Sequence, residues 1–295
     1  MYKCEKLSKK NFNSFLELNN KAKDFNELNL DYNHIYESLS FKDLLMLKNN
    51  IKLLKVNEEY HGFVWYNTDD SRRNIIIIDS LYLKPTDINV DLFNCFINKL
   101  NKNIILEYET LTTERNSKEL RAFGFKEYKG NIEMELCLKD FNKYNYLLNK
   151  NINFQTFIQG KHELIRCEIQ NQVFKNKDRI PLTVDDIYFD ETQEYYLEDC
   201  SIFLKCNEEY IGYGQIILDN KPIIVNLGIL ENYRGLGLGK VLLLKLIEMA
   251  KKRGFDYISI KVLNSNIVAK NLYKGLGFKE QREFTIWQLS VKKKR

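Results

Sequence analysis

The sequence predicts a mixed α/β fold that occurs twice along the chain. Strand-like and helix-like segments alternate clearly through the second half of the 295 residues. Short sequence matches also recur between the two halves at nearly constant spacing. Hydrophobic residues make up 44% and charged residues 29%, which is typical of a globular chain with a packed core. This composition excludes an intrinsically disordered protein.

The internal repeat rests on two pairs of matching segments. LKVNEEYHG begins at Leu54 and LKCNEEYIG at Leu204, and seven of the nine positions are identical. GFKE begins at Gly124 and again at Gly277, so the two offsets are 150 and 153 residues. Each LK segment resembles a hairpin, and each GFKE lies between a helix-like run and a strand-like run. Two matches in the same order indicate a duplicated unit of domain size, and not a chance similarity of hairpins.

The repeat divides the chain into two expected domains, residues 1–145 and residues 150–295. The boundary is expected in the polar, aperiodic stretch 140–153. In the second domain, apolar spacing predicts the helices, and a continuous apolar run predicts a buried central strand. The expected order is a strand at 153–158, a helix at 162–174, a hairpin at 201–206 and 211–218, the central strand at 222–230, a helix at 240–254, a strand at 257–263, a helix at 266–278 and a strand at 285–291.

The segment ENYRGLGLGK, residues 231–240, joins the expected central strand to the helix that follows. Glycines before a helix N-terminus form an anion site, because the first N–H groups of the helix lack partners inside the helix. Two phosphate motifs fail here. Val241 follows Lys240 where a Walker loop needs Ser or Thr, and Lys240 itself replaces the last glycine of a dinucleotide fingerprint.

A third phosphate motif fits. Arg234 to Gly239 matches Arg/Gln-x-x-Gly-x-Gly/Ala, so the segment resembles the pyrophosphate loop of the GCN5-related N-acetyltransferase (GNAT) family, which binds acetyl-coenzyme A. NIVAKNLYKGLGF at 266–278 resembles the second signature of that family. The resemblance covers roughly 153–291 and implies two tandem acyl-CoA N-acyltransferase (GNAT) folds when combined with the repeat. The matching residues of the second signature are Asn266, Ala269, Leu272, Tyr273, Gly277 and Phe278.

The resemblance implies acetyl-coenzyme A as cosubstrate and assigns a role to each binding residue. Arg234 and Lys240 would add charge near the pyrophosphate, and Asn266 would hydrogen-bond the coenzyme arm. The strand Leu227 to Ile229 would pair with the pantetheine arm, and the Ile229 amide would polarise the thioester carbonyl. The amides that would hold the pyrophosphate are those of Gly235, Leu236, Gly237, Leu238, Gly239 and Lys240.

Tyr273 is the candidate general acid, because the thiolate leaving group needs a proton and the family motif is matched here. The general base is not identified, since the central strand offers only Asn226. An acidic stretch upstream is either a solvated surface or a site that attracts a cationic amine and relays its proton, so a base that acts through water stays open. Its carboxylates are Asp185, Asp186, Asp190, Glu191, Glu194, Glu198 and Asp199.

The first half lacks both chemical signatures. It has no glycine loop after its expected central strand, and Asp87 and Asp91 lie where a pyrophosphate would need positive charge. Thr113 stands at the position of the motif asparagine and Leu120 at the position of the motif tyrosine. We therefore expect residues 1–145 to be a degenerate copy without a coenzyme site.

The leading prediction is an acetyl-CoA-dependent N-acetyltransferase, in which an amine attacks the thioester directly and only the C-terminal half is active. The alternative is a coenzyme A-binding sensor or interaction protein without turnover. The expected partner is a small-molecule or peptide amine acceptor. The net charge of +5 gives little support to nucleic-acid binding, no apolar run has the length of a membrane span, and no cysteine or histidine spacing suggests a metal site. Scattered cysteines favour a cytoplasmic location. We expect the protein to be a monomer or homodimer.

Overall fold

The computed structural model describes residues 1–36, 47–68, 74–85, 89–100, 103–139, 141, 151–176 and 179–292. Most of the expected boundary stretch, and Asp87, lie outside these residues. The chain forms two compact units. Unit 1 contains Met1–Asn131 and Arg282–Arg295, and unit 2 contains Ile132–Gln281. Each unit is described by itself below.

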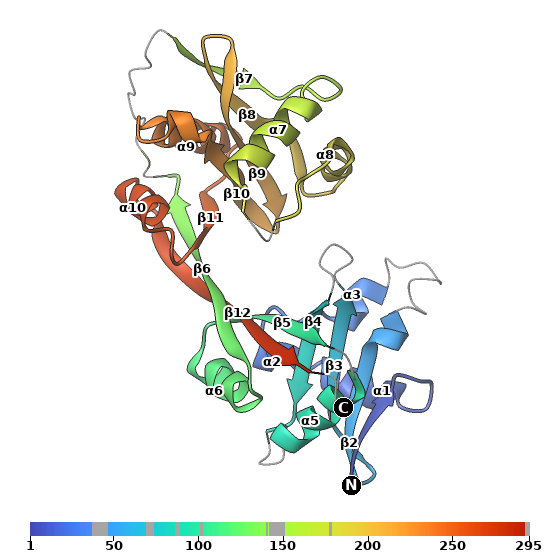
Figure 1. Ribbon diagram of the computed structural model, residues 1–295. Helices are drawn as coiled ribbons and strands as arrows, with labels where there is room; N and C mark the ends of the chain where they lie inside the picture. The colour runs from blue at the N-terminus through green and yellow to red at the C-terminus, as the bar shows by residue number, and fades with distance from the viewer. Residues whose placement is uncertain are drawn as a thin grey trace. The chain divides into compact units, whose positions relative to one another are not determined.

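Unit 1 is a mixed sheet in the strand order β1-β2-β3-β4-β5-β12 (Figure 1). Strands β4 and β5 are parallel, and the other neighbours are antiparallel. Its elements are β1 (Tyr2–Lys6), α1 (Phe12–Asn19), α2 (Ala22–Phe25), α3 (Tyr32–Tyr36), β2 (Ile51–Val56), β3 (Glu59–Thr68), β4 (Ile75–Leu83), α5 (Asn89–Leu100), β5 (Ile104–Leu111), α6 (Glu114–Ala122), the first part of β6 (Lys126–Cys137) and most of β12 (Lys279–Val291).

Unit 2 repeats this plan in the order β6-β11-β10-β9-β8-β7. Strands β10 and β11 are parallel, and β7 to β10 form an antiparallel meander. Its elements are the end of β6, β7 (Ile152–Thr156), α7 (Glu163–Val173), α8 (Val184–Glu191), β8 (Tyr196–Cys206), β9 (Glu209–Asp219), β10 (Lys221–Ile229), the 3₁₀ turn η1 (Glu231–Tyr233), α9 (Leu238–Lys252), β11 (Tyr257–Leu263), α10 (Ile267–Gly275) and the start of β12.

The last strand of each sequence half continues into the other compact unit: the end of β6 belongs to unit 2 and most of β12 to unit 1. In unit 1, β12 pairs with β5 from Phe284↔Leu111 to Val291↔Ile104. Trp287 of this strand is fully buried there, and its Nε1 donates to Thr110 Oγ1 at 3.1 Å. Figure 1 shows β12 in red beside β5.

In unit 2 the equivalent place is taken by the end of β6. Met134 and Leu136 lie in the apolar core of this unit, and Glu133 forms an ion pair with Lys221 of β10. The compact units therefore differ from the ranges 1–145 and 150–295 by an exchange of strand segments, the end of β6 for most of β12. The two strands occupy equivalent positions in the repeat, so their apolar pattern alone does not specify which sheet each one joins.

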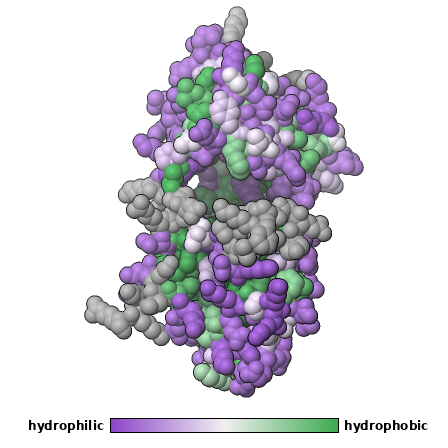
Figure 2. Space-filling model, turned by 90° about the vertical axis from the view of Figure 1, so that its right-hand side faces the viewer, coloured by the Kyte–Doolittle hydropathy of each residue, from purple (hydrophilic) through white to green (hydrophobic). Residues whose placement is uncertain are grey.

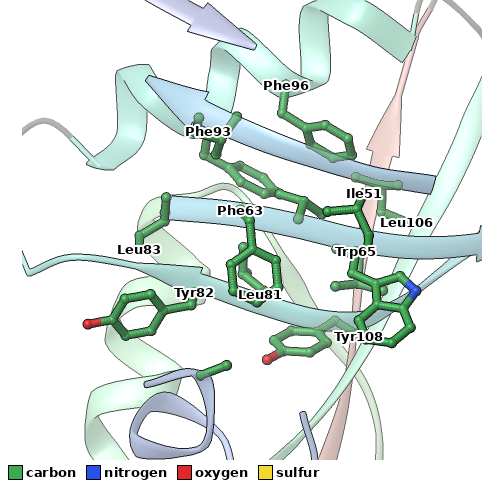
Figure 3. Packing of buried hydrophobic residues seen from close by; sticks show 14 of the residues in the cluster. Ile51, Phe63, Trp65, Leu81, Tyr82, Leu83, Phe93, Phe96, Leu106 and Tyr108 are labelled. Carbon is green, nitrogen blue, oxygen red and sulfur yellow. The ribbon is translucent and has the colours of Figure 1, made fainter. Parts of the chain in front are cut away.

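The core of unit 1 is rich in aromatic side chains, as Figure 3 shows. Phe63 of β3 lies edge-on to Phe15 of α1, with ring centroids 5.1 Å apart. Phe93 and Phe96 of α5 are also fully buried. These contacts hold helices against both faces of the sheet, because successive residues of a strand point to opposite faces.

Unit 2 buries two separate apolar clusters. Ile202, Leu204 and Ile216 pack with the leucines of α9, whereas Phe203 and Tyr213 pack with residues of α7 and α8. The alternation along β8 shows that α9 and the α7–α8 pair cover opposite faces of this sheet. No helix among the described residues is long and apolar enough to cross a membrane. The face in Figure 2 is mainly hydrophilic, with apolar residues in small groups.

The structure contains every element that was predicted for the second copy and adds the short turn η1 and helix α8. This helix begins with a capping box, in which Thr183 and Asp186 exchange hydrogen bonds at 3.2 and 2.7 Å. The Thr-x-x-Asp spacing after Pro181 was the signal for a helix start. The helix was not predicted because its apolar spacing is weak: many of its residues are acidic and only Ile187 is buried.

Candidate functional site

Strands β10 and β11 diverge in the middle of unit 2. They pair in parallel only at Ile223↔Ser259 and Ile224↔Ile260. Beyond this point β10 contains a bulge, where its register with β9 shifts between Val225 and Gly228. A bulge bends its strand and increases the local twist. The result is an opening between the two strands, here called the unit 2 gap.

The end of β10 presents backbone N–H groups to the unit 2 gap. Leu230 N–H donates to the carbonyl of Ile211 in β9 at 2.8 Å. Backbone groups of successive strand residues point to opposite sides, so the N–H groups of Ile229 and Leu227 point away from β9. Pairing of this strand with the pantetheine arm needs N–H groups that point away from β9. Polarisation of the thioester carbonyl by the Ile229 amide needs the same direction.

A hollow of about 380 Å³ lies at the unit 2 gap. Its walls include Val225, Asn226 and Leu227 from β10, Ile260 from β11, and Phe174 after α7. Asn226 has a left-handed backbone conformation, with φ of 56°, and its Nδ2 donates to Gln215 Oε1 at 3.4 Å. A left-handed residue other than glycine is uncommon and often marks a functional place.

The glycine loop follows directly on this strand end. Gly235 and Gly237 have φ of 78° and 74°, which explains why these two positions are glycine. A Cβ at either position would have no atom within 4 Å, so the space above the loop is open. Gly237 is the N-cap of α9, and the N–H groups of Leu238 and Gly239 form its first turn. The loop and helix start therefore make an accessible anion site.

The predicted binding residues around the loop have different surroundings. Arg234 donates from Nε to the carbonyl of Ile229 at 3.0 Å and from Nη2 to the carbonyl of Val173 at 3.2 Å. It thus ties the loop to the end of β10 and to the end of α7. Leu236 and Lys240 are exposed at the loop. Gly239 has no left-handed backbone, so its backbone conformation does not require glycine.

The second signature forms α10. Asn266 is the N-cap, and its Oδ1 accepts from Ala269 N–H at 3.1 Å. Tyr273 is buried, with its ring 5.9 Å from that of Phe278. Burial raises the pKa of the Tyr273 phenol to about 12, so the hydroxyl keeps its proton at neutral pH. A protonated phenol can act as a proton donor.

The acidic stretch is divided between solvent and the interior. Asp185, Glu194 and Glu198 are exposed. Asp190 accepts hydrogen bonds from Arg166 and from the Tyr195 hydroxyl, the latter at 2.8 Å.

Glu191 is partly buried and has a different environment from the exposed carboxylates. Burial, followed by the charge of Glu163, raises its pKa to about 7. Burial raises the pKa of the Cys200 thiol and so disfavours its nucleophilic thiolate. The described residues contain no group of side chains that could hold a metal ion.

The equivalent opening in unit 1 is closed by the chain itself. Strands β4 and β5 pair only up to Ile78↔Tyr108, so they also diverge. Asn29 Nδ2 donates to the Leu81 carbonyl at 3.0 Å, and Leu81 N–H donates to Asn29 Oδ1 at 3.1 Å. On the other side, Asn26 binds the backbone of β5 at Glu109, with a distance of 2.9 Å.

Leu81 is the counterpart of Leu227. Gly62 lies opposite Leu83 in unit 1, and the repeated Gly212 lies opposite Ile229 in unit 2. Two residues earlier in each strand are Leu81 and Leu227. The backbone groups that face the gap at Leu227 are therefore bonded to an asparagine side chain in unit 1.

Comparison with known proteins agrees with the geometry of unit 2. The sequence model described as Acetyltransferase (GNAT) family matches residues 169–278. This segment is a GNAT domain. An [ribosomal protein bS18]-alanine N-acetyltransferase of Haemophilus influenzae is 40% identical over 76 residues, which cover 25% of this chain and 51% of that protein. The chain spans about half the length of the curated relatives that it matches.

Solved structures match nearly the whole chain. A GCN5-related N-acetyltransferase from Sphaerobacter thermophilus superposes with a TM-score of 0.70 at 13% identity, covering 99% of this chain and 96% of that one. A tandem GNAT protein from the clavulanic acid biosynthesis pathway gives 0.65 at 10% identity and covers all of both chains. These matches confirm the predicted fold of two tandem GNAT units.

Proposed function

We propose that the protein is an acetyl-CoA-dependent N-acetyltransferase that acts on a primary amine, with its active site in the C-terminal half. The observation that supports this most is the combination of the unit 2 gap with the open glycine loop at the start of α9. The gap offers backbone N–H groups for an extended ligand, and the loop offers N–H groups for an anion. Coenzyme A carries both features, a pantetheine arm and a pyrophosphate.

In this proposal different residues of the chain bind the coenzyme, align its arm and donate a proton. The amides of residues 235–240 hold the pyrophosphate, and the backbone from Leu227 to Ile229 aligns the pantetheine arm. Acetyl-CoA supplies the acetyl group as a thioester. The Ile229 N–H stabilises negative charge on the carbonyl oxygen, and Tyr273 donates a proton toward the sulfur. Asn266 contributes through its position at the start of α10.

The second candidate function is a coenzyme A-binding protein without turnover. Asn226 favours it, because an amide in the wall of the hollow cannot accept a proton as a carboxylate would. The Tyr273→Phe variant separates the two candidates. A catalytic Tyr273 predicts a loss in kcat of about 100-fold or more, with the affinity for acetyl-CoA unchanged.

A thermal-shift titration tests the proposed cosubstrate first. Binding to the folded state alone raises Tm with ligand concentration, by about 2.7 kcal/mol of stability at a hundred times Kd. Release of coenzyme A from acetyl-CoA with a panel of primary amines then tests transfer. The proposal is wrong if saturating acetyl-CoA leaves Tm unchanged. An amine-independent Tm shift, with no amine that accelerates coenzyme A release, supports the sensor.

A further inference from the structure

Unit 2 contains a cluster of buried polar side chains beneath α7 and α8. Arg166 of α7 is only 2% exposed, and its guanidinium lies over the ring of Tyr213 at 5.3 Å. The same guanidinium bonds Asp190 of α8. Glu163, one turn before Arg166, is 3% exposed. Burying polar and charged groups of this kind is costly unless they are paired and hydrogen-bonded.

Several atoms of this cluster have no hydrogen-bond partner within the described part of the chain. They are Arg166 Nε and Nη1, Gln170 Nε2, Gln215 Nε2 and Glu191 Oε1. Buried polar atoms nearly always have a partner in native proteins, in the form of protein, water or ligand. They belong to α7, β9 and the end of α8, and bound water is the partner that such buried atoms commonly have.

The cluster reaches the candidate site through Gln215. Its Oε1 accepts from Asn226 Nδ2 at 3.4 Å and from the Tyr213 hydroxyl at 3.3 Å. Asn226 lines the hollow at the unit 2 gap, and Tyr213 contacts Arg166. A series of contacting side chains thus leads from Asn226 through Gln215, Tyr213 and Arg166 to Asp190 of α8, the residue before Glu191.

Among these carboxylates Glu191 is the one suited to accept a proton. Asp190 is held by Arg166 and by the Tyr195 hydroxyl, and Asp186 caps its own helix. Glu191 keeps one buried oxygen without a protein partner. We propose that Glu191 takes the proton from the acceptor ammonium, through water that bridges the polar groups between Asn226 and Glu191.

The proton balance is simple, and the inference rests on the proposed function. The ammonium N–H bond breaks and gives a neutral amine, whose lone pair becomes available for attack. Its proton passes along the bridging water to the Glu191 carboxylate, which later releases it to solvent. An amine that is a cation at neutral pH is the class of acceptor this arrangement serves, because Glu163, Asp190 and Glu191 outnumber the single charge of Arg166.

The electrostatic surroundings fit this role. Glu163 and Arg166 of α7, Asp190 of α8 and Tyr196 of β8 all interact with the charge of Glu191. Burial raises the pKa of the Glu191 carboxyl from 4.5 to about 7, and Glu163 and Asp190 act in the same direction. A base whose pKa is near the working pH transfers protons most effectively.

The test compares Glu191→Gln with Asp185→Asn, a change at an exposed carboxylate of the same helix. The probes are acetyl-CoA with ethanolamine and with a tripeptide that has a free N-terminal alanine. For the wild type we expect kcat/KM to rise with pH around an apparent pKa near 7. Glu191→Gln should lose this rise and about 100-fold in kcat/KM at pH 7.5. Asp185→Asn should retain both.

A stability measurement gives a readout that does not depend on turnover. A carboxyl with a raised pKa in the folded state stabilises it at low pH, and this contribution is lost as pH rises through about 7. Glutamine carries no charge, so the variant has no such loss. The Tm of Glu191→Gln minus the Tm of the wild type should therefore be about 2 °C larger at pH 8 than at pH 5. Asp185→Asn should show no such difference.

The outcomes separate this inference from the proposed function. If Glu191→Gln keeps the wild-type pH profile while Tyr273→Phe loses activity, the role of Glu191 is overturned and the proposed function stands. Loss of acetyl-CoA binding in Glu191→Gln overturns that role as well, since the carboxyl would then support the fold. If no amine of the panel, these two included, accelerates coenzyme A release by the wild type, both the function and this inference fail.

Discussion

The two gaps between diverging strands are the most informative comparison in this chain. In both units a parallel strand pair separates after a few residues, at Ile78 of β4 and at Ile224 of β10. In unit 1, Asn26 and Asn29 bond the backbone on the two sides of the gap. In unit 2 the same place holds a hollow. The duplicated fold thus has one gap filled by its own side chains and one that can receive a ligand.

The helix starts that follow β10 and β4 also differ in how well they suit a phosphate. Unit 2 has Gly235 and Gly237 with left-handed backbone and open space above them. In unit 1, Asp91 lies in the first turn of α5. A carboxylate at this helix start suits the helix dipole but repels a phosphate. Coenzyme binding by unit 2 alone is therefore the proposal that the comparison supports.

Separating the sequence halves should have the largest effect. Residues 1–145 alone lack β12 and Trp287, and residues 150–295 alone lack Met134 and Leu136 of β6. Each fragment would leave a sheet edge unpaired and a core incomplete. We expect neither fragment to show a cooperative unfolding transition by calorimetry, whereas co-expression of both should restore one. A cooperative transition in residues 150–295 alone would show that the strand exchange is dispensable.

Removing the filler of the unit 1 gap should have the next largest effect. Asn29→Ala leaves the N–H and carbonyl of Leu81 without their partner in a buried place. Such a loss costs about 1–3 kcal/mol for each unsatisfied group. Denaturant unfolding should show this loss, while acetyl-CoA affinity, measured by calorimetry, stays unchanged. An altered affinity would mean that the unit 1 gap takes part in coenzyme binding.

The smallest effect concerns Asn266, for which unit 1 supplies the control residue. Thr113 caps α6 by accepting from Asn116 N–H at 3.1 Å, as Asn266 caps α10. Asn266→Thr should therefore retain stability, whereas Asn266→Ala should cost about 1 kcal/mol. If Asn266 also binds the coenzyme arm, Asn266→Thr weakens acetyl-CoA binding without a change in Tm. Unchanged affinity in Asn266→Thr limits this residue to capping.

The sequence predicted the elements of unit 2 well because their patterns are local. Apolar spacing gave α7 and α9, and the alternation of glycines gave the loop before α9. The strand exchange could not be predicted, because the ends of β6 and β12 have equivalent apolar patterns and nothing local distinguishes their partners.

The filled gap of unit 1 and the buried cluster around Glu191 were also missed. Both depend on contacts between residues that lie far apart in the chain, such as Asn29 with Leu81 or Arg166 with Asp190. Asn26 and Asn29 resemble ordinary loop asparagines in the sequence, and the acidic residues of α8 resemble a solvated surface. Their roles appear only when burial and partners are known.

The stoichiometry of acetyl-CoA binding tests the comparison most directly. Isothermal titration of the whole chain should give one site per chain. The Gly237→Val variant should remove that site, because a β-branched residue is strained at φ of 74°. Two sites per chain, or a site that survives Gly237→Val, would contradict a single coenzyme site in unit 2.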